Sequence, residues 1–221
     1  MSINSTQKIK CPSCGQMHTV TVWNSVTVED SPDLKKDLLC GKLNIFQCSS
    51  CGFRALMPTP MLYHDKEKKL LISFSPCDDE SIKKRLFSNV CESSKQSGEL
   101  KSYEGYNLRF VCEYNSLLEK ILIFDSELND KALEIIKLLI LSQEPDKADN
   151  RNCIFGKKVD NEIEFIVNDL KENQVYTSRI PIETYNTIWQ ELRNSGVKPY
   201  SFDWEYVNSE YADKLINGIN N

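Results

Sequence analysis

Two short cysteine pairs constrain the fold of this sequence more than any other feature. The first lies in CPSCG, residues 11–15, and the second in CSSCG, residues 48–52. Each pair places two thiols three positions apart on a tight turn that ends in glycine, so that four sulfurs can converge on one tetrahedral metal ion. Zn²⁺ is the ion we expect. The predicted ligands are Cys11, Cys14, Cys48 and Cys51.

The predicted site is structural, because a zinc ion held by four thiolates has no open position for water or substrate. Two CxxCG turns also occur in rubredoxin, in which the same sulfurs hold one redox-active iron, so an iron electron carrier stays open as an alternative. His18 follows the first pair closely and could replace a cysteine. The set of four is already complete, however, and we interpret His18 as an ordinary strand or surface histidine.

The composition is that of a soluble globular protein, with 40% hydrophobic and 27% charged residues in 221. The opening MSINSTQKIK has no apolar run typical of a secretory signal, and no window approaches the roughly 18 apolar residues of a membrane span. We therefore expect a cytoplasmic protein that does not enter membranes. In that compartment the remaining five cysteines are expected to be reduced and to lie in the core or half-buried. They are Cys40, Cys77, Cys91, Cys112 and Cys153.

The charge is divided unevenly along the chain. The formal net charge is −5, with +3 in residues 1–75 and −8 in residues 76–221. Four thiolates and one Zn²⁺ lower the charge of the first part further, so the strongly basic surface typical of nucleic-acid-binding proteins is missing. Nucleic-acid binding is therefore an alternative that we do not favour. Its candidate contacts are Lys8, Lys10, Lys35, Lys36, Lys42 and Arg54, with Trp23 or Phe53 for base stacking.

Hydrophobic periodicity predicts an α+β protein whose first part, residues 1–76, is a zinc-ribbon-like antiparallel β domain with one inserted short helix. Ser31 before Pro32 predicts the N-cap of that helix, and Gly41 follows its end. Alternating residues predict the strands of this domain. The expected strands are 8–10, 18–28, 44–47, 53–57 and the hairpin 61–64 with 70–75.

The second part, residues 77–145, is expected to be a mainly helical continuation, and the third, residues 146–221, an α+β region. The boundary between them is placed in the polar stretch 143–152. The second part should contain a helix from Asp78 to about Val90, a polar loop or linker over 92–104, a strand over 106–112 and two further helices. The last of these, which begins after Asn129, has an apolar face too wide for a solvated helix and is either a core helix or part of an interface. The third part should contain an antiparallel meander of strands 153–159, 162–170 and 175–180, a helix over 181–194 and a short C-terminal helix.

No catalytic residue is predicted. His64 stands next to Asp65, but neighbouring residues of a strand point to opposite faces, so the pair does not form a base with its orienting partner. Cys40 lies at a helix C-terminus, where the dipole raises a thiol pKa, and we expect it to pack and not to react. The chain also lacks GxSxG, a glycine-rich phosphate loop and HExxH.

The order of these motifs resembles the CpXC domain family. The resemblance rests on CPSCG, VTVWNSVTV, SPDLKKDLL with its following glycine, NIFQC leading into CSSCG, and LYHD. It covers at least residues 8–75, and RFVCEYNSLLEKILIFD and KALEIIKLLI are similar to the family's downstream region. Ser49 stands where the CPxC pattern has proline, which leaves the ligands intact. The resemblance implies a bacterial zinc-binding domain and supports the four metal ligands, but it carries over no catalytic residue.

Together these observations predict a non-enzymatic zinc-binding protein that binds a protein partner or its own copy. The closed metal site and the broad apolar helix 131–141 motivate this prediction. Two alternatives stay open beside the iron carrier. One is the nucleic-acid-binding ribbon, and the other is an enzyme whose site is assembled from residues dispersed along the sequence.

Overall fold

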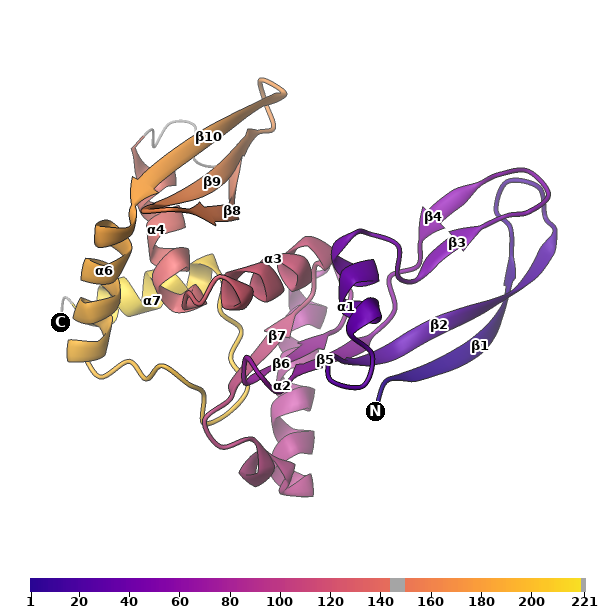
Figure 1. Ribbon diagram of the computed structural model, residues 1–221, viewed down its shortest axis with the longest axis horizontal. Coiled ribbons are helices and arrows are strands. Elements are labelled where there is room, and N and C mark those ends of the chain that lie inside the picture. The colour runs from indigo at the N-terminus through magenta and orange to yellow at the C-terminus, as the bar shows by residue number, and fades with distance from the viewer. Residues whose placement is uncertain (144–149, 220–221) are drawn as a thin grey trace. The chain divides into compact units, whose positions relative to one another are not determined.

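The computed structural model describes residues 1–143 and 150–219, and it has the predicted α+β composition (Figure 1). The chain forms two compact units. Each is one stretch of sequence, except that three residues near the C-terminus belong to the first unit. The first unit comprises Met1–Leu118 and Phe202–Trp204, and the second comprises Glu119–Ser201 and Glu205–Asn221.

A five-stranded sheet with the order β1-β2-β5-β6-β7 forms the centre of the first unit (Figure 1). Its strands are β1 (Ile3–Lys10), β2 (Met17–Thr27), β5 (Met61–Asp65), β6 (Leu70–Phe74) and β7 (Asn107–Val111). Four of them lie where strands are predicted, and β1 is longer than the predicted strand 8–10, because it begins at Ile3. β5 and β6 form the predicted antiparallel hairpin, in which Met61 pairs with Phe74.

The prediction of an antiparallel N-terminal domain is wrong at the centre of this sheet, which is mixed. β2 and β5 are parallel neighbours over Ser25–Thr27, and β6 and β7 are parallel along their whole length. Parallel neighbours require a long crossover connection. The connection from β2 to β5 contains α1 (Pro32–Leu39) and the second cysteine pair. The connection from β6 to β7 contains α2 (Glu80–Ser97).

Helices cover both faces of the β6–β7 part of this sheet. Phe110 and Phe74 lie on opposite faces, because Phe110 is next to Ser73 across the strands and Phe74 is next to Val111. Phe87 of α2 packs on Phe110, with ring centroids 5.4 Å apart. On the other face Tyr114, the first residue of α3 (Tyr114–Asp125), contacts Phe74 and donates a hydrogen bond to the carbonyl of Leu38 in α1.

The loop predicted over 92–104 is instead regular structure. α2 begins at the Asp79 N-cap, whose carboxylate accepts bonds from the backbone of Ser81 and Ile82, and it continues to Ser97. A 3₁₀ helix, η1 (Glu99–Tyr103), follows directly. The polar end of α2 is held by a residue far along the chain, since the indole N–H of Trp204 donates to Ser94 Oγ at 2.7 Å. Local composition cannot reveal such a contact.

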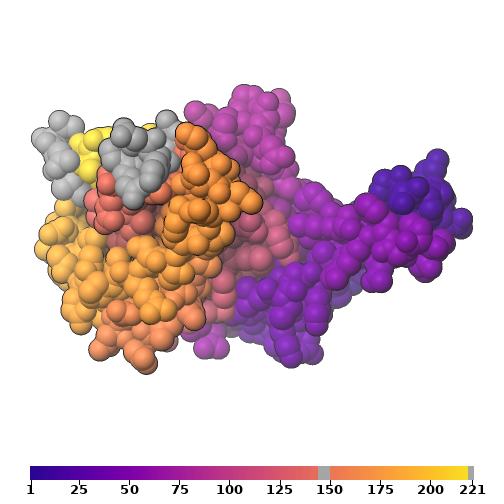
Figure 2. Space-filling view, turned by 90° about the horizontal axis from the view of Figure 1, so that it is seen from above, coloured from indigo at the N-terminus to yellow at the C-terminus, as the bar shows by residue number. Residues whose placement is uncertain are grey.

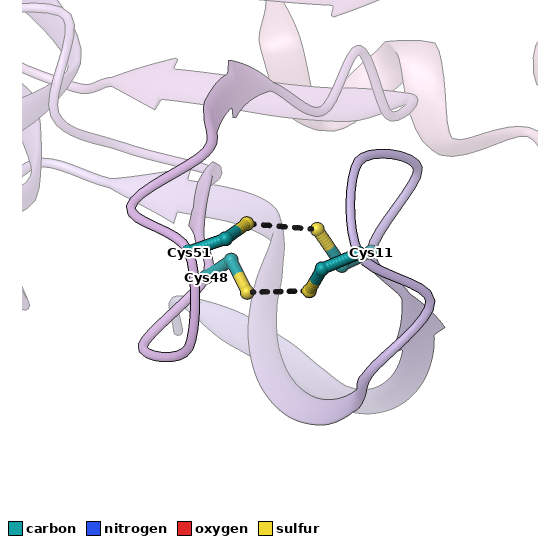
Figure 3. Close-up of side chains that lie close together, drawn as sticks. Cys11, Cys48 and Cys51 are labelled. Carbon is teal, nitrogen blue, oxygen red and sulfur yellow. Dashed lines mark hydrogen bonds between the residues drawn. The ribbon is translucent and has the colours of Figure 1, made fainter.

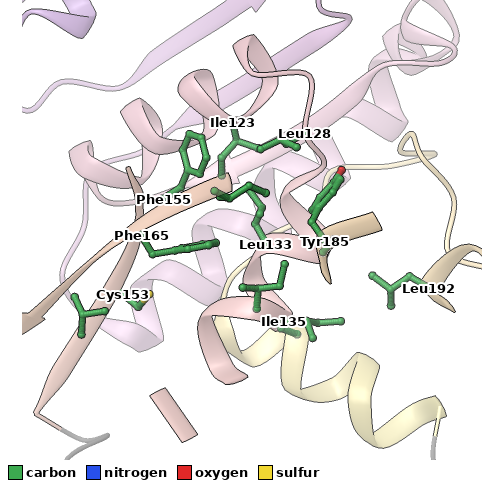
Figure 4. Close-up of a cluster of buried hydrophobic side chains, with 14 residues drawn as sticks. Ile123, Leu128, Leu133, Ile135, Cys153, Phe155, Phe165, Tyr185 and Leu192 are labelled. Atoms are coloured by element: carbon green, nitrogen blue, oxygen red, sulfur yellow. The ribbon is translucent and has the colours of Figure 1, made fainter. Parts of the chain in front are cut away.

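The second unit contains the predicted antiparallel meander, with the order β10-β9-β8. Its core joins the sheet to the helices and includes Ile123, Leu133, Phe155, Phe165 and Tyr185 (Figure 4). The broad apolar helix is therefore a core helix of this unit. The elements are α4 (Asp130–Ser142), β8 (Arg151–Val159), β9 (Glu162–Asp169), β10 (Gln174–Pro181), α6 (Ile182–Asn194) and α7 (Ser209–Ile219).

The second unit also buries a network of charged side chains between α3 and α4. Lys120 Nζ lies 3.0 Å from a carboxylate oxygen of both Asp130 and Glu134. Lys137 pairs with Glu134 and with Glu119 at 2.9 and 3.1 Å. Burial lowers the pKa of Lys137, but these two carboxylates outweigh it and hold the pKa above its usual range. Lys137 thus stays charged at neutral pH despite its burial.

The burial of the five remaining cysteines agrees in part with the prediction. Cys112 and Cys153 are buried, and Cys77 and Cys91 are half-buried. Burial raises the pKa of Cys153 to about 12, so this thiol is unreactive. Cys40 is exposed, contrary to the prediction, because α1 turns only its Leu38 face inward and ends at this residue.

The predicted three-part division, 1–76, 77–145 and 146–221, stays a prediction. Most of the boundary segment 143–152 falls on residues 144–149, which lie outside the described part of the chain.

Candidate metal centre

The two cysteine pairs form turns of the same geometry. In the first, the N–H of Gly15 donates to the carbonyl of Cys11 at 2.9 Å, and Cys11 N–H donates to the carbonyl of Gln16 at 2.8 Å. In the second, Gly52 and Cys48 make the same bonds, with Phe53 in place of Gln16. Gly15 and Gly52 have φ values of +76° and +74°, a region that a Cβ disfavours. The sequence CxxCG therefore specifies both turns locally.

The four sulfurs of these turns converge. The ligand atoms of Cys11, Cys14, Cys48 and Cys51 lie within 4.8 Å of one another. Figure 3 shows the two turns facing each other, with Cys11 Sγ 3.7 Å from Cys51 Sγ and Cys14 Sγ 3.6 Å from Cys48 Sγ. Zinc–sulfur bonds of about 2.3 Å in a tetrahedron place sulfurs about 3.8 Å apart. The four cysteines are therefore placed to hold one metal ion.

The pKa values of two of these thiols shift in opposite directions. Burial raises the pKa of Cys48, but hydrogen bonds from backbone N–H groups, that of Cys51 first, lower it to about 6. A backbone bond from Gln16 lowers the pKa of Cys14, but burial and the neighbouring thiols raise it to about 12. One thiolate in the cluster thus opposes ionisation of another, and a divalent cation at the centre would allow all four to ionise.

A small apolar cluster surrounds the inner half of the site. Cys11 and Cys48 are each 1% exposed and pack with Phe46, whereas Cys14 and Cys51 are exposed. Phe46 belongs to β3 (Ile45–Gln47), which pairs with β4 (Arg54–Leu56). We call β1, β2, β3, β4 and the two turns the metal finger, residues 3–27 and 44–57. The partly buried members of its cluster are Ile9, Val20, Phe53 and Met57.

Asn44 joins the two ribbons of the metal finger. Its side-chain oxygen accepts from the N–H of Trp23 at 2.8 Å, and its side-chain nitrogen donates to the carbonyl of Trp23 at 2.9 Å. The amide of Asn44 thereby satisfies the backbone of β2 as a neighbouring strand would. These bonds fix the second ribbon against the first, and with it the distance between the two turns.

His18, interpreted from sequence as an ordinary strand or surface histidine, lies on β2 beside the cysteine cluster. Its Nε2 lies 3.1 Å from Cys48 Sγ, and its ring packs edge-on against Phe46 with centroids 5.5 Å apart. An N–H donor beside a thiolate offsets part of the negative charge of a four-sulfur site. Alternation along β2 could have indicated this position, because His18 shares a face with Val20, which packs against the cluster.

Replacing His18 with phenylalanine should weaken metal binding about 10- to 100-fold, because the ring contact with Phe46 is kept while the contact of Nε2 with Cys48 Sγ is lost. Competition against a chromophoric chelator at fixed pH would measure the change. The matched control is His64→Phe, which alters the only other histidine. Equal metal affinities of His18→Phe and the parent would show that this bond does not tune the site.

His64 and Asp65 do not act as a pair. Asp65 is 2% exposed and lies 2.9 Å from Lys35 Nζ, 3.2 Å from the hydroxyl of Tyr63 and 3.0 Å from the N–H of Lys68. His64 lies on the opposite face, 3.4 Å from the hydroxyl of Tyr106. The two side chains thus point to opposite faces of β5, as predicted.

The second unit contains a cavity of about 360 Å³, where a site assembled from dispersed residues could lie. Among the described residues, its lining contains no histidine, cysteine or carboxylate, so these residues offer no acid–base pair. Arg151, the one cation among the described lining residues, donates through Nε to Asp169 at 3.0 Å and lies over the ring of Tyr176. Its other lining residues are Ile140, Leu141, Gln143, Val167 and Ser178.

The residues considered for nucleic-acid binding have different surroundings. Lys35 is paired with Asp65, and Phe53 packs in the apolar cluster of the metal finger. Lys8, Lys10, Lys36, Lys42 and Arg54 are exposed, and Trp23 is half-buried. Nucleic-acid binding thus stays an alternative, with one of its six cations already paired.

Comparison with known proteins gives one positive result. The family model described as CpXC protein matches residues 9–137, which include both cysteine pairs. Searches of curated proteins and of solved structures give no match, so no solved fold supports the description as a zinc ribbon. No helix in the described part of the chain is long and apolar enough to cross a membrane. Because the family match spans more than half of the sequence and includes all four converging cysteines, this chain belongs to the CpXC family.

Proposed function

We propose that Cys11, Cys14, Cys48 and Cys51 bind one structural Zn²⁺ and that the chain is a non-enzymatic module for binding a protein partner or its own copy. One observation carries the metal assignment. The sulfurs of the two turns lie 3.6 and 3.7 Å apart, which matches the distance between sulfurs in a tetrahedral zinc tetrathiolate. A cytoplasmic location belongs to the proposal, because four thiolates persist in a reducing compartment.

The donor set supports a structural role for the ion. Four protein ligands complete a tetrahedron, so no position is left for a reacting water. The two buried cysteines tie the ion to Phe46 and its neighbours, where it extends a hydrophobic cluster too small to order two ribbons by itself. Bound metal would supply the cross-link between the turns that disulfides supply in secreted domains.

Metal analysis of the purified chain tests this assignment. We expect one zinc per chain, no visible colour, and absorption bands of tetrahedral thiolate-bound Co²⁺ after cobalt exchange. Cys14→Ser should lower the metal content, and Cys40→Ser, which removes an exposed thiol outside the site, should not. A red, iron-containing protein would contradict the proposal and favour the rubredoxin-like electron carrier.

The proposed binding role rests on the chemistry of the described residues. The four cysteines leave no open position on the ion, the described lining of the cavity in the second unit has no acid–base pair, and one of the cations considered for nucleic-acid binding, Lys35, is paired with Asp65. These features favour an interaction module over the enzyme and the nucleic-acid-binding ribbon. The surface of the metal finger indicates which kind of partner it could take.

A further inference from the structure

β1 presents an open edge. Within the described residues it pairs only with β2, from Asn4–Trp23 through Lys10–Met17, and every β1 residue is exposed or half-exposed. At the opposite end of the same sheet all five residues of β7 are buried. An exposed strand edge is a row of backbone N–H and C=O groups that can pair with a further strand. The metal finger therefore offers a ready position for an added strand.

The part of the chain that carries this edge contains no carboxylate side chain. Asp and Glu make up 32 of the 221 residues, yet none occurs in 1–28 or 40–64. The cations there are Lys8, Lys10, Lys42 and Arg54, and none of them forms an ion pair within the described residues. In contrast, Arg179 of the other exposed edge strand, β10, pairs with Glu164 at 2.9 Å. The charge at the β1 edge is thus available to a partner.

Lys8 and Lys10 share the solvent face of β1. Side chains alternate along a strand, and Ile9 between them points to the apolar cluster of the metal finger. The two ammonium groups therefore stand on one side, about 6.8 Å apart along the strand axis. Carboxylates two residues apart on an added strand would lie directly opposite them. Figure 2 shows indigo N-terminal residues at the molecular surface, next to purple residues of the same unit.

We propose that an extended, carboxylate-rich segment of a partner protein docks along β1 as a sixth strand, with its acidic side chains against Lys8 and Lys10. This rests on the proposed function of the metal finger as an interaction module and names the chemistry of its partner. Backbone hydrogen bonds give the affinity, and the alternating carboxylates give the register. Lysines on an open edge disfavour neutral and basic strands, so the same two residues select against other partners.

Two other occupants fit the edge less well. A second copy pairing through β1 would bring two more lysines and no carboxylate to the seam. A nucleic acid would satisfy the charges but would leave the row of backbone groups unpaired. The acidic strand satisfies the edge and the charges together.

A peptide as long as β1, 8 residues, with glutamate and threonine alternating, tests the proposal on the zinc-loaded full chain. We expect it to bind, to release at high salt, and to protect the amides of β1 from hydrogen exchange. Lys8→Gln and Lys10→Gln should each weaken binding up to about fivefold. The double variant Lys8→Glu, Lys10→Glu should instead bind a lysine–threonine peptide better than the glutamate–threonine peptide. The matched control is Lys101→Glu, an exposed lysine of η1, which should leave binding unchanged.

Several results would overturn this proposal. These are equal binding of a glutamine–threonine peptide, protection outside β1, a concentration-dependent dimer that protects β1, or a single-stranded oligonucleotide that binds the same edge. Absence of peptide binding by a chain that carries its full zinc would also overturn it, and would leave the metal assignment standing. A chain without metal would instead contradict the proposed function itself.

Discussion

Cys11→Ser should abolish stable metal binding and unfold the metal finger while leaving the second unit folded. Structural zinc sites contribute roughly 10 to 16 kcal/mol of apparent binding free energy, which is coupled to folding. Cys11 is one of the two buried ligands, and its loss removes both an ion contact and a member of the Phe46 cluster. Hydrogen exchange followed by mass spectrometry should therefore show lost protection in residues 3–22 and 44–57. The amides of β8, β9 and β10 should keep theirs.

The control for this variant is Cys40→Ser, which changes the same residue type at an exposed position outside the centre. It should keep its metal and the exchange pattern of the parent. Cys48→Ser should repeat the effect of Cys11→Ser from the other turn. Uniform loss of protection across both units in the Cys11 variant would show that the chain folds as one cooperative body, against this prediction.

Lys120→Ala should cost about 3 to 5 kcal/mol of unfolding free energy, because it leaves the carboxylates of Asp130 and Glu134 buried without their shared cation. Asp130 is 0% exposed and Glu134 4%, so solvent cannot replace the lost partner. Urea unfolding followed by circular dichroism would give the difference in stability. A low midpoint without a cooperative transition would mean that the second unit loses its packing altogether, which agrees with the prediction.

Lys214→Ala is the matched control, since Lys214 pairs with Glu210 one helical turn away in α7, and both side chains are exposed. Its removal should change the unfolding free energy by about 0.5 kcal/mol or less. If the two variants have similar stability, the buried network contributes no more than a surface ion pair. That outcome would contradict the role assigned to Lys120.

The candidate metal centre was predictable because its information is local. A CxxCG turn specifies its own hydrogen bonds and its glycine conformation, so two copies in one chain already predict four converging sulfurs. The same holds for β5 with β6, for the C-terminal meander and for α6, whose residue periodicity and turn residues are contiguous in sequence. In each case the contacts that decide the structure lie within a few residues of one another.

What the sequence did not predict depends on distant contacts. The parallel pairing of β2 with β5 follows from a crossover of more than thirty residues, and periodicity within a strand carries no sign of its neighbour's direction. The end of α2 is polar and is held by Trp204, and the ion pairs of Lys120 depend on how two helices face each other. The contact of His18 with Cys48 depends on how the second turn faces β2, so the sequence indicates the buried face of His18 but not its partner. Sequence patterns do not show which distant residues will be in contact, so they cannot predict structure that depends on such contacts.

Trp204 also constrains the order in which the chain can be completed during synthesis. Its ring is 8% exposed and packs with Leu71 and Leu108 of the first unit, together with Phe87 of α2. A ribosome therefore releases the first 118 residues long before the residue that closes their core has been made. The metal finger can bind its ion early, but the part of this unit beneath α2 has to wait until nearly the whole chain has emerged. A fragment cut after Leu118 would correspond to that unfinished state, with the apolar surface meant for Trp204 exposed to water.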